Sequence, residues 1–109
     1  MPGYYVLKKN SSGQFHFVLK ADNHEVILSS EVYSSKQGAL TGIASCQANS
    51  PLDARYDKRT SSASQPYFVL KAANHEIIGN SQMYASTSGR DGGIASCKVN
   101  GPTTKIEEI

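Results

Sequence analysis

Two copies of the triplet Asn-His-Glu are the residues in this chain whose types and spacing could support chemistry. Asn23-His24-Glu25 recurs 51 positions later as Asn74-His75-Glu76. An imidazole next to a carboxylate can bind a metal ion or exchange a proton near neutral pH. Adjacent residues of an extended chain point to opposite faces, however, so His24 and Glu25 are poorly placed to share one ligand. We therefore expect two solvated turns, and we predict no catalytic residue, no metal site and no cofactor.

A lysine stands three positions before each triplet. Opposite charges across a two-stranded ribbon contribute about 0.2–1 kcal/mol, so pairing of each lysine with the nearby glutamate explains its presence without a ligand. The alternative is a binding role, because the same polar phrase is kept in both copies. The candidate binding surface comprises Lys20, Asn23, His24, Glu25, Lys71, Asn74, His75 and Glu76.

The triplets belong to a longer internal duplication. Residues 17–25 return as 68–76, and residues 42–46 return as 93–97, with the same offset in both cases. A duplication without gaps over this span predicts two copies of one structural unit.

Each copy has about 50 residues, which is too few to bury a comfortable core alone. We therefore predict a single domain over residues 1–109, built from repeat 3–51 and repeat 52–109 around a shared core. The chain is expected to be a monomer that contains an internal pseudo-dimer.

The pattern of each copy predicts three strands followed by a helix, which is an α+β fold. Apolar residues alternate with other residues from Phe15 to Leu19, which is the period of a strand. Ala39, Ile43 and Cys46 recur at helical spacing after serines that can cap a first turn. The connections are short, so the strands form an antiparallel meander with the helices packed on the sheet. The predicted strands are 4–9, 15–20, 25–29, 55–60, 67–72, 76–80 and 103–106, and the helices are about 35–49 and 86–99.

Several residues around the helices have expected structural roles. Tyr33 and Tyr84 precede the two helices, where an aromatic ring wedges a helix against a sheet. Gly42 lies beside the apolar stripe and allows close approach of the helix. Cys46 and Cys97 occupy equivalent positions, and we expect two buried, inert thiols. A disulfide or a metal pair across the pseudo-axis is the alternative.

Charge gives weak support for a nucleic-acid partner. The net charge is +2, whereas dedicated nucleic-acid binders carry a denser basic stripe. A modest basic zone with tyrosines nearby lies on the first strand of each copy, and such groups can hold a phosphate backbone and stack bases. A solvated sheet edge protected by charge explains the same residues. The zone comprises Lys8, Lys9, Arg55, Lys58 and Arg59, with Tyr4, Tyr5 and Tyr56.

Motifs for targeting and catalysis are not found in the sequence. The first residues carry no apolar run of the length that a signal peptide needs. Nothing approaches the roughly 18 consecutive apolar residues of a membrane helix. Phosphate-binding loops, zinc-protease motifs and nucleophile elbows are absent as well. We expect a cytoplasmic protein that does not enter a membrane and is not an enzyme.

The repeated phrase Phe-Val-Leu-Lys-Ala-x-Asn-His-Glu, the tyrosine before each helix and Gly-Ile-Ala-Ser within it resemble the YegP-like family of small bacterial proteins. The resemblance implies two β(3)-α-β units that merge into one antiparallel sheet and exchange C-terminal strands. It implies no established activity and no site residues. Many members have Asn-Gly where this chain has Asn23-His24 and Asn74-His75. The type I′ turn expected there needs positive φ, which histidine tolerates better than most residues.

These observations favour a non-enzymatic binding or interaction module. Its two pseudo-symmetric surfaces would engage a protein partner that is itself two-fold or repetitive. Weak nucleic-acid binding through the basic first strands is one alternative. A metal-binding or enzymatic site at the Asn-His-Glu turns is another.

Overall fold

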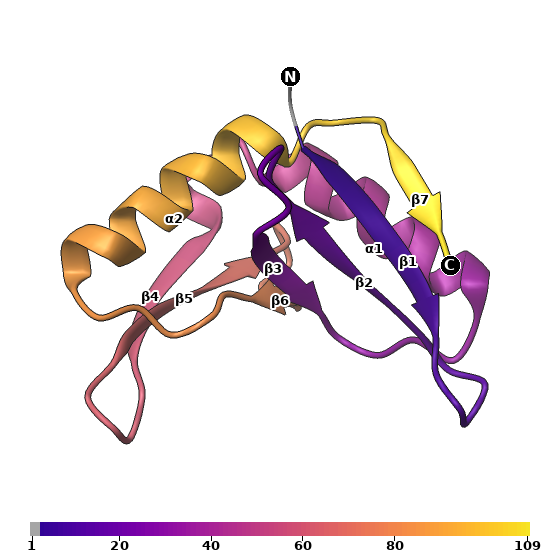
Figure 1. Ribbon diagram of the computed structural model, residues 1–109, viewed down its shortest axis with the longest axis horizontal. Coiled ribbons are helices and arrows are strands. Elements are labelled where there is room, and N and C mark those ends of the chain that lie inside the picture. The colour runs from indigo at the N-terminus through magenta and orange to yellow at the C-terminus, as the bar shows by residue number, and fades with distance from the viewer. Residues whose placement is uncertain (1–2) are drawn as a thin grey trace.

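The computed structural model describes residues 3–109 and places seven strands in one sheet with two helices packed on it (Figure 1). Residues 1–2 of the predicted domain lie outside the described residues. The elements in chain order are β1 (Tyr4–Lys9), β2 (Phe15–Lys20), β3 (Val26–Ser30), α1 (Lys36–Asn49), the 3₁₀ turn η1 (Asp53–Arg55), β4 (Tyr56–Thr60), β5 (Pro66–Lys71), β6 (Ile77–Asn80), α2 (Thr87–Asn100) and β7 (Ile106–Glu108).

The strand order in the sheet is β4-β5-β6-β3-β2-β1-β7. Within each repeat the neighbouring strands are antiparallel, and β3 and β6 join the repeats through an antiparallel contact that pairs Ser29 with Asn80. The predicted α+β class and the merged sheet are therefore confirmed. The pair that β7 forms with β1 is the parallel exception.

Strand exchange takes place in one direction. β7 follows α2 in the second repeat, yet it pairs with β1 of the first. After α1 the chain runs through η1 directly into β4, so the first repeat has no separate terminal strand to give. The last strand also begins at Ile106 rather than at residue 103, because a turn in which the Thr103 amide donates to the Asn100 carbonyl follows α2.

Both helices begin where a serine caps them. The Ser35 hydroxyl accepts the Gly38 amide at 3.0 Å, and the Ser86 hydroxyl accepts the Gly89 amide at the same distance. Each helix then packs on strands of both repeats: α1 contacts β2, β5 and β6, and α2 contacts β2, β3 and β5. This crossed packing makes one core out of two small units.

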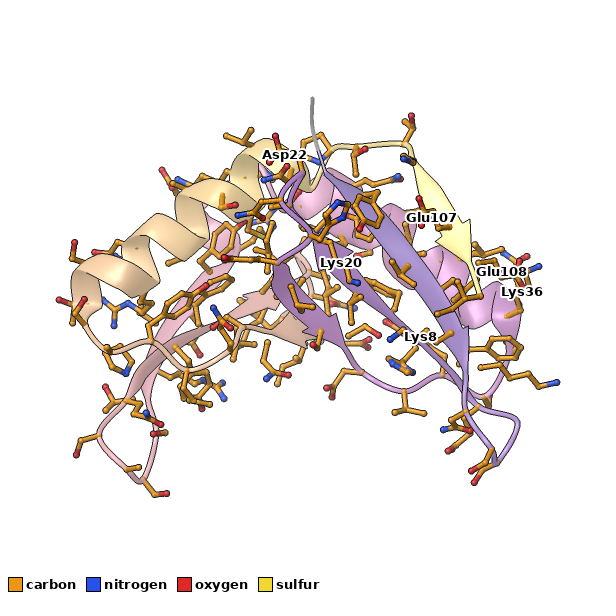
Figure 2. The ribbon with its side chains drawn as sticks, viewed as in Figure 1. Lys8, Lys20, Asp22, Lys36, Glu107 and Glu108 are labelled. Carbon is orange, nitrogen blue, oxygen red and sulfur yellow. The ribbon has the colours of Figure 1, made fainter. Side chains whose placement is uncertain are left out.

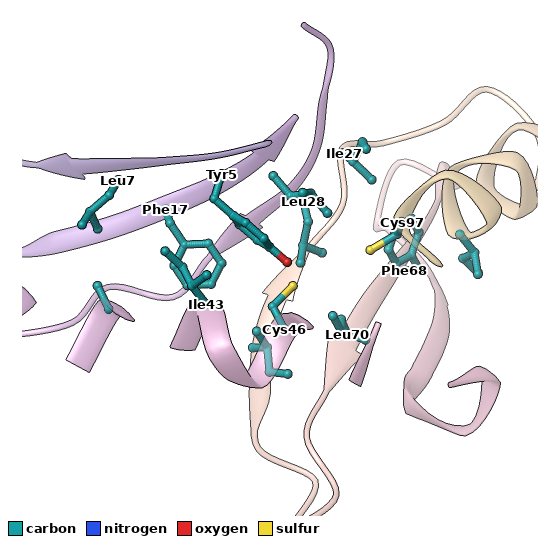
Figure 3. Packing of buried hydrophobic residues seen from close by; sticks show 14 residues of the cluster. Tyr5, Leu7, Phe17, Ile27, Leu28, Ile43, Cys46, Phe68, Leu70 and Cys97 are labelled. Atoms are coloured by element: carbon teal, nitrogen blue, oxygen red, sulfur yellow. The ribbon is translucent and has the colours of Figure 1, made fainter. Parts of the chain in front are cut away.

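The core contains aromatic and aliphatic side chains from both repeats (Figure 3). Tyr5, Phe17 and Phe68 come from the sheet, and all three are fully buried. Cys46 and Cys97 enter the same cluster from the helices as free thiols. The expected buried cysteines are confirmed.

The two Asn-His-Glu turns have the same backbone geometry. The His24 amide donates to the Ala21 carbonyl at 2.9 Å, and the His75 amide donates to the Ala72 carbonyl at the same distance. Both histidines have φ of 70°, so the expected positive φ is confirmed. The type I′ turn is wrong, because it needs positive φ at both central residues of the turn, and here only the residue after them has it.

Candidate binding grooves

Each Asn-His-Glu hairpin faces the helix of the other repeat across a shallow groove. In the first groove the hairpin between β2 and β3 supplies Asn23 and Glu25, and α2 supplies Gly92, Gly93 and Ser96. The volume of this groove is about 220 Å³. The groove exists because α2 packs on β2 and β3, strands of the opposite repeat.

A second groove repeats this arrangement at the hairpin that lies at the opposite end of the β3–β6 pair. The hairpin between β5 and β6 supplies Asn74 and Glu76, and α1 supplies Thr41, Gly42 and Ser45. Its volume is about 210 Å³, close to the 220 Å³ of the first groove.

The two grooves are related by the internal repeat. Nine of the ten residues that line the first groove have their 51-residue counterparts in the second. The shared pairs are Ala21 and Ala72, Asn23 and Asn74, Glu25 and Glu76, Val26 and Ile77, Ile27 and Ile78, Tyr33 and Tyr84, Thr41 and Gly92, Gly42 and Gly93, and Ser45 and Ser96. The grooves therefore offer two nearly equivalent sets of polar groups.

A tyrosine and a glycine shape the floor of each groove. Tyr33 stacks on Phe17 with ring centroids 6.2 Å apart, and its hydroxyl lies over Gly42, where any Cβ atom would overlap it. Tyr84 lies in the same way over Gly93. The tyrosines wedge the helices against the sheet, as predicted, and bare glycine backbone lets each hydroxyl reach the groove.

The electrostatic character of the grooves is acidic. Burial raises the pKa of Tyr84, and the nearby Glu25 carboxylate raises it further. Burial likewise raises the pKa of Tyr33, and Glu76 is among the charges that raise it further. Among the described residues, no lysine or arginine lines either groove. One carboxylate, with neutral hydroxyl and amide groups, suits a ligand that carries a positive charge and hydrogen-bond donors.

The structure divides the predicted binding surface into two parts. The asparagines and glutamates line the grooves, and each asparagine Oδ1 accepts the amide of the following glutamate at 3.1 Å. The lysines and histidines lie outside them. The His24 Nδ1 is 2.6 Å from the Tyr4 hydroxyl, whereas His75 and Lys71 line a hollow next to β4.

The two histidine turns are not brought together. They precede β3 and β6, which are antiparallel and pair near their last residues, so the turns lie at opposite ends of this pair. No group of three or more histidine, cysteine, aspartate or glutamate side chains within residues 3–109 is arranged to hold a metal ion.

The basic first strands are also apart. Four strands separate β1 from β4 in the sheet, so their lysines and arginines do not form one zone. Tyr5 is buried and Tyr56 is half-buried, and both pack against phenylalanine rings inside the protein. Arg59 and Lys58 are paired with Asp57 and Asp91.

The helix side of each groove was not among the predicted site residues. Thr41, Ser45 and Ser96 come from the helices, and only a tertiary contact between repeats brings them to the hairpins. The available signal was the repeated Gly-Ile-Ala-Ser phrase, whose small and hydroxyl-bearing residues recur with the hairpin phrase.

Within the described part of the chain, neither helix is both long and apolar enough to cross a bilayer.

Comparisons with known proteins identify relatives over the whole chain. The family described as "Domain of unknown function (DUF1508)" matches twice, over residues 10–57 and 61–108. A UPF0339 protein of Shewanella oneidensis is 58% identical over 100% of this chain and 99% of its own length. The UPF0339 protein YegP of Escherichia coli K12 is 54% identical over 99% of this chain and 98% of its own.

Two solved structures are similar in fold as well. The solution NMR structure of the Shewanella oneidensis UPF0339 protein has a TM-score of 0.93 at 58% identity, and covers 99% of this chain and 92% of that one. The solution NMR structure of yegP from E. coli, described as a protein of unknown function, has a TM-score of 0.94 at 54% identity, with coverages of 99% and 93%.

Proposed function

Because the chain belongs to the DUF1508 family and carries two copies of its domain, we propose that it is a non-enzymatic binding module that uses the two grooves. The observation that carries the proposal is their correspondence: nine lining positions match across the repeat. Two nearly equivalent grooves suit a partner with two equivalent features.

The chemistry of the grooves points to cationic side chains of a protein partner. Glu25 and Glu76 supply one negative charge in each groove, and both are exposed at the rim. Tyr84 and Tyr33 add a hydroxyl that can accept or donate a hydrogen bond. A lysine or arginine side chain satisfies both groups at once. The two repeats form an internal dimer, so a cytoplasmic monomer presents both grooves to a two-fold or repetitive partner.

The test is a titration of the ¹⁵N-labelled protein with N-acetyl-arginine amide, a cationic probe. We expect amide shifts in residues 23–26 and 92–96 together with residues 41–45 and 74–77. The acidic analogue N-acetyl-glutamate amide is the matched control and should move none of them. Equal shifts with both probes, or no shift with the cationic one at millimolar concentration, would contradict the proposal.

A pair of variants separates the grooves. Glu25→Gln is expected to abolish the shifts in the first groove and to leave the second unchanged, and Glu76→Gln should do the reverse. Glu107→Gln, on β7 and outside both grooves, is the control for a general loss of negative charge. If Glu107→Gln weakens binding as much as the groove variants do, the effect is non-specific.

A further inference from the structure

The edges of β1 and β4 that face away from the rest of their own repeats are equivalent by repeat but differ in what covers them. On one side β7 pairs with β1. On the other side, within residues 3–109, no strand pairs with the outer edge of β4. Residues 56–60 of β4 correspond to residues 5–9 of β1 under the 51-residue offset. The open edge of β4 is therefore the vacant counterpart of a site that the chain fills elsewhere with its own C-terminal segment.

The covered edge shows how such a site holds an extended segment. The Tyr5 amide donates to the Lys105 carbonyl at 2.9 Å, and the Ile109 amide donates to the Leu7 carbonyl at 3.0 Å. These bonds place residues 105–109 parallel to β1. Alternate backbone groups of the segment therefore face the sheet.

Side chains of α1 complete that site. The Gln47 amide donates to the Thr103 carbonyl at 2.8 Å, and the Lys36 ammonium lies 2.7 Å from a Glu108 carboxylate oxygen (Figure 2). The segment is thus held between the edge of the sheet and the helix that covers it.

A hollow of about 420 Å³ lies at the equivalent place beside β4 and α2. Its lining includes Tyr56, Lys58, Ile94, Ala95 and Lys98. Their counterparts on the covered side are Tyr5, Leu7, Ile43, Ala44 and Gln47. The same framework therefore surrounds a filled site in one half of the molecule and an open one in the other.

Exposure follows this difference. Tyr5 and Leu7 are buried almost completely beneath the C-terminal segment, whereas Tyr56 is only half-buried and the Lys58 side chain is 54% exposed. An edge strand presents unpaired N–H and C=O groups, and a lysine at its outer position limits unspecific pairing. The Leu7 carbonyl accepts from the Ile109 amide, so it faces away from β2. The N–H and C=O groups of Lys58, at the equivalent position, therefore face away from β5.

We propose that the edge of β4 and the adjacent face of α2 form an acceptor site for an extended segment of a partner protein, added as a parallel strand. The site is separate from the two grooves. The segment carries an apolar residue beside Tyr56 and Ile94 and an acidic residue two positions later beside Lys58. Ile106 and Glu108 show this spacing on the covered edge, where they pair in register with Tyr5 and Leu7.

The charges of the site fit an acidic residue. Lys58 lies 3.4 Å from Asp91, with about half of each side chain exposed, and Lys98 is paired with Asp53, whose side chain is exposed. Exposed ion pairs contribute little to stability, so the carboxylate of an incoming segment can replace either aspartate as the partner of its lysine. The turn η1 already accepts the Tyr56 amide through the Asp53 carbonyl. Pairing with the partner segment therefore depends on Lys58 and Thr60.

A second copy of this chain is the less favourable occupant. Its C-terminal segment is already paired with its own β1, and moving it to β4 of a neighbour would uncover the edge that it left. The exchange would break as many contacts as it forms. A segment from another protein adds contacts without this loss.

The test uses a synthetic peptide with the sequence of residues 101–109 as the probe. Added to the ¹⁵N-labelled full-length protein, it is expected to shift the amides of residues 56–60 and 91–98 and to slow hydrogen exchange at Lys58. Shifts confined to residues 4–9 would mean that the peptide merely replaces β7, and would overturn the proposal. So would the absence of shifts at millimolar peptide.

Two N-methylated peptides test the parallel pairing. The Ile109 amide faces the sheet on the covered edge, and the amide before it faces away by strand alternation. Methylation at the position of Ile109 should therefore weaken binding at least tenfold, and methylation at the position of Glu108 should leave it nearly unchanged. Equal effects would exclude strand addition.

A protein variant supplies an independent check. Lys58→Pro removes an outward amide and leaves the amides that pair with β5, because proline is tolerated where the N–H of an edge strand faces solvent. Peptide binding should fall at least tenfold while the β5 amides keep their chemical shifts. Sedimentation at rising protein concentration tests self-association. If the protein forms a dimer that Lys58→Pro abolishes and that the peptide does not dissociate, the edge of β4 binds a second copy of the chain. That result would overturn the proposal.

Discussion

The two histidines share one backbone conformation but have different neighbours. Both have φ of 70°, a region that costs an L-residue about 1–2 kcal/mol and costs glycine nothing. The hydrogen bond between His24 and the Tyr4 hydroxyl offsets part of this conformational cost. Arg55 stands at the position equivalent to Tyr4, and its Nε donates to Asn49 instead.

We therefore expect His75→Gly to raise the free energy of unfolding by about 0.5–1 kcal/mol, since it relieves the positive φ. His24→Gly should change it by less, because the contact with Tyr4 is lost. Urea unfolding of the two variants and the parent protein measures the difference. A loss of stability in His75→Gly would mean that this imidazole makes contacts that the structure does not contain.

The two buried cysteines make the free energy of unfolding fall with rising pH in the alkaline range. Burial raises the pKa of Cys46 to about 12 and that of Cys97 to about 11. In the unfolded chain both ionise near pH 8.5. Stability is therefore complete below that pH and declines as pH rises toward 11–12, because only the unfolded state loses the proton.

The expected decline is about 1.4 kcal/mol per pH unit for each thiol. Urea unfolding between pH 7.5 and pH 10.5 measures it, and Cys97→Ala should make the slope shallower. The folded protein should also resist thiol reagents at pH 8 and react once unfolded. Rapid modification of the native protein would show that the thiols are accessible.

At the scale of the elements, adjacent glycines in α2 have opposite roles. A Cβ atom at Gly93 would overlap the Tyr84 hydroxyl, whereas a Cβ atom at Gly92 would meet nothing within 4 Å. Gly93→Ala should lower the free energy of unfolding by about 1–3 kcal/mol. Gly92→Ala should raise it by up to about 1 kcal/mol, because alanine favours the helix.

Thermal melting followed by circular dichroism distinguishes the two variants. They add the same methyl group at neighbouring positions of the helix. Equal effects would indicate that helix propensity alone governs this region. The close approach of Tyr84 to α2 would then have no energetic consequence.

Local patterns in the sequence predict the elements well and their long-range partners poorly. The alternation from Phe15 to Leu19 and the capping serines locate the strands and helices, since these signals act within one element. The last strand is shifted because its position depends on pairing with β1, about 100 residues away in the chain. The grooves escape prediction for the same reason: a hairpin in one repeat meets a helix in the other.

At the scale of the whole molecule, the pseudo-symmetry is kept inside and lost at the edges. The two grooves correspond at nine of their ten lining positions, and much of the core recurs in both repeats, because both arise from contacts between the repeats. The outer strands do not correspond, because β7 covers β1, whereas the first repeat runs from α1 through η1 directly into β4 and supplies no strand to cover it. The molecule therefore combines two equivalent grooves with an edge of β1 that β7 covers and an edge of β4 that no strand covers within residues 3–109.

We propose that the two repeats form a single cooperative domain, because α1 and α2 each pack on strands of both repeats. A chain cut near Leu52 should yield an N-terminal fragment that, at micromolar concentration, shows no cooperative thermal transition. Its mixture with the C-terminal fragment should recover the transition and the chemical shifts of the intact protein, because the missing half of the core returns. Circular dichroism and NMR of the separate and mixed fragments measure this. A compact N-terminal monomer that melts cooperatively by itself would show that each repeat folds alone, and the crossed packing of the helices would then be a contact between two independent domains.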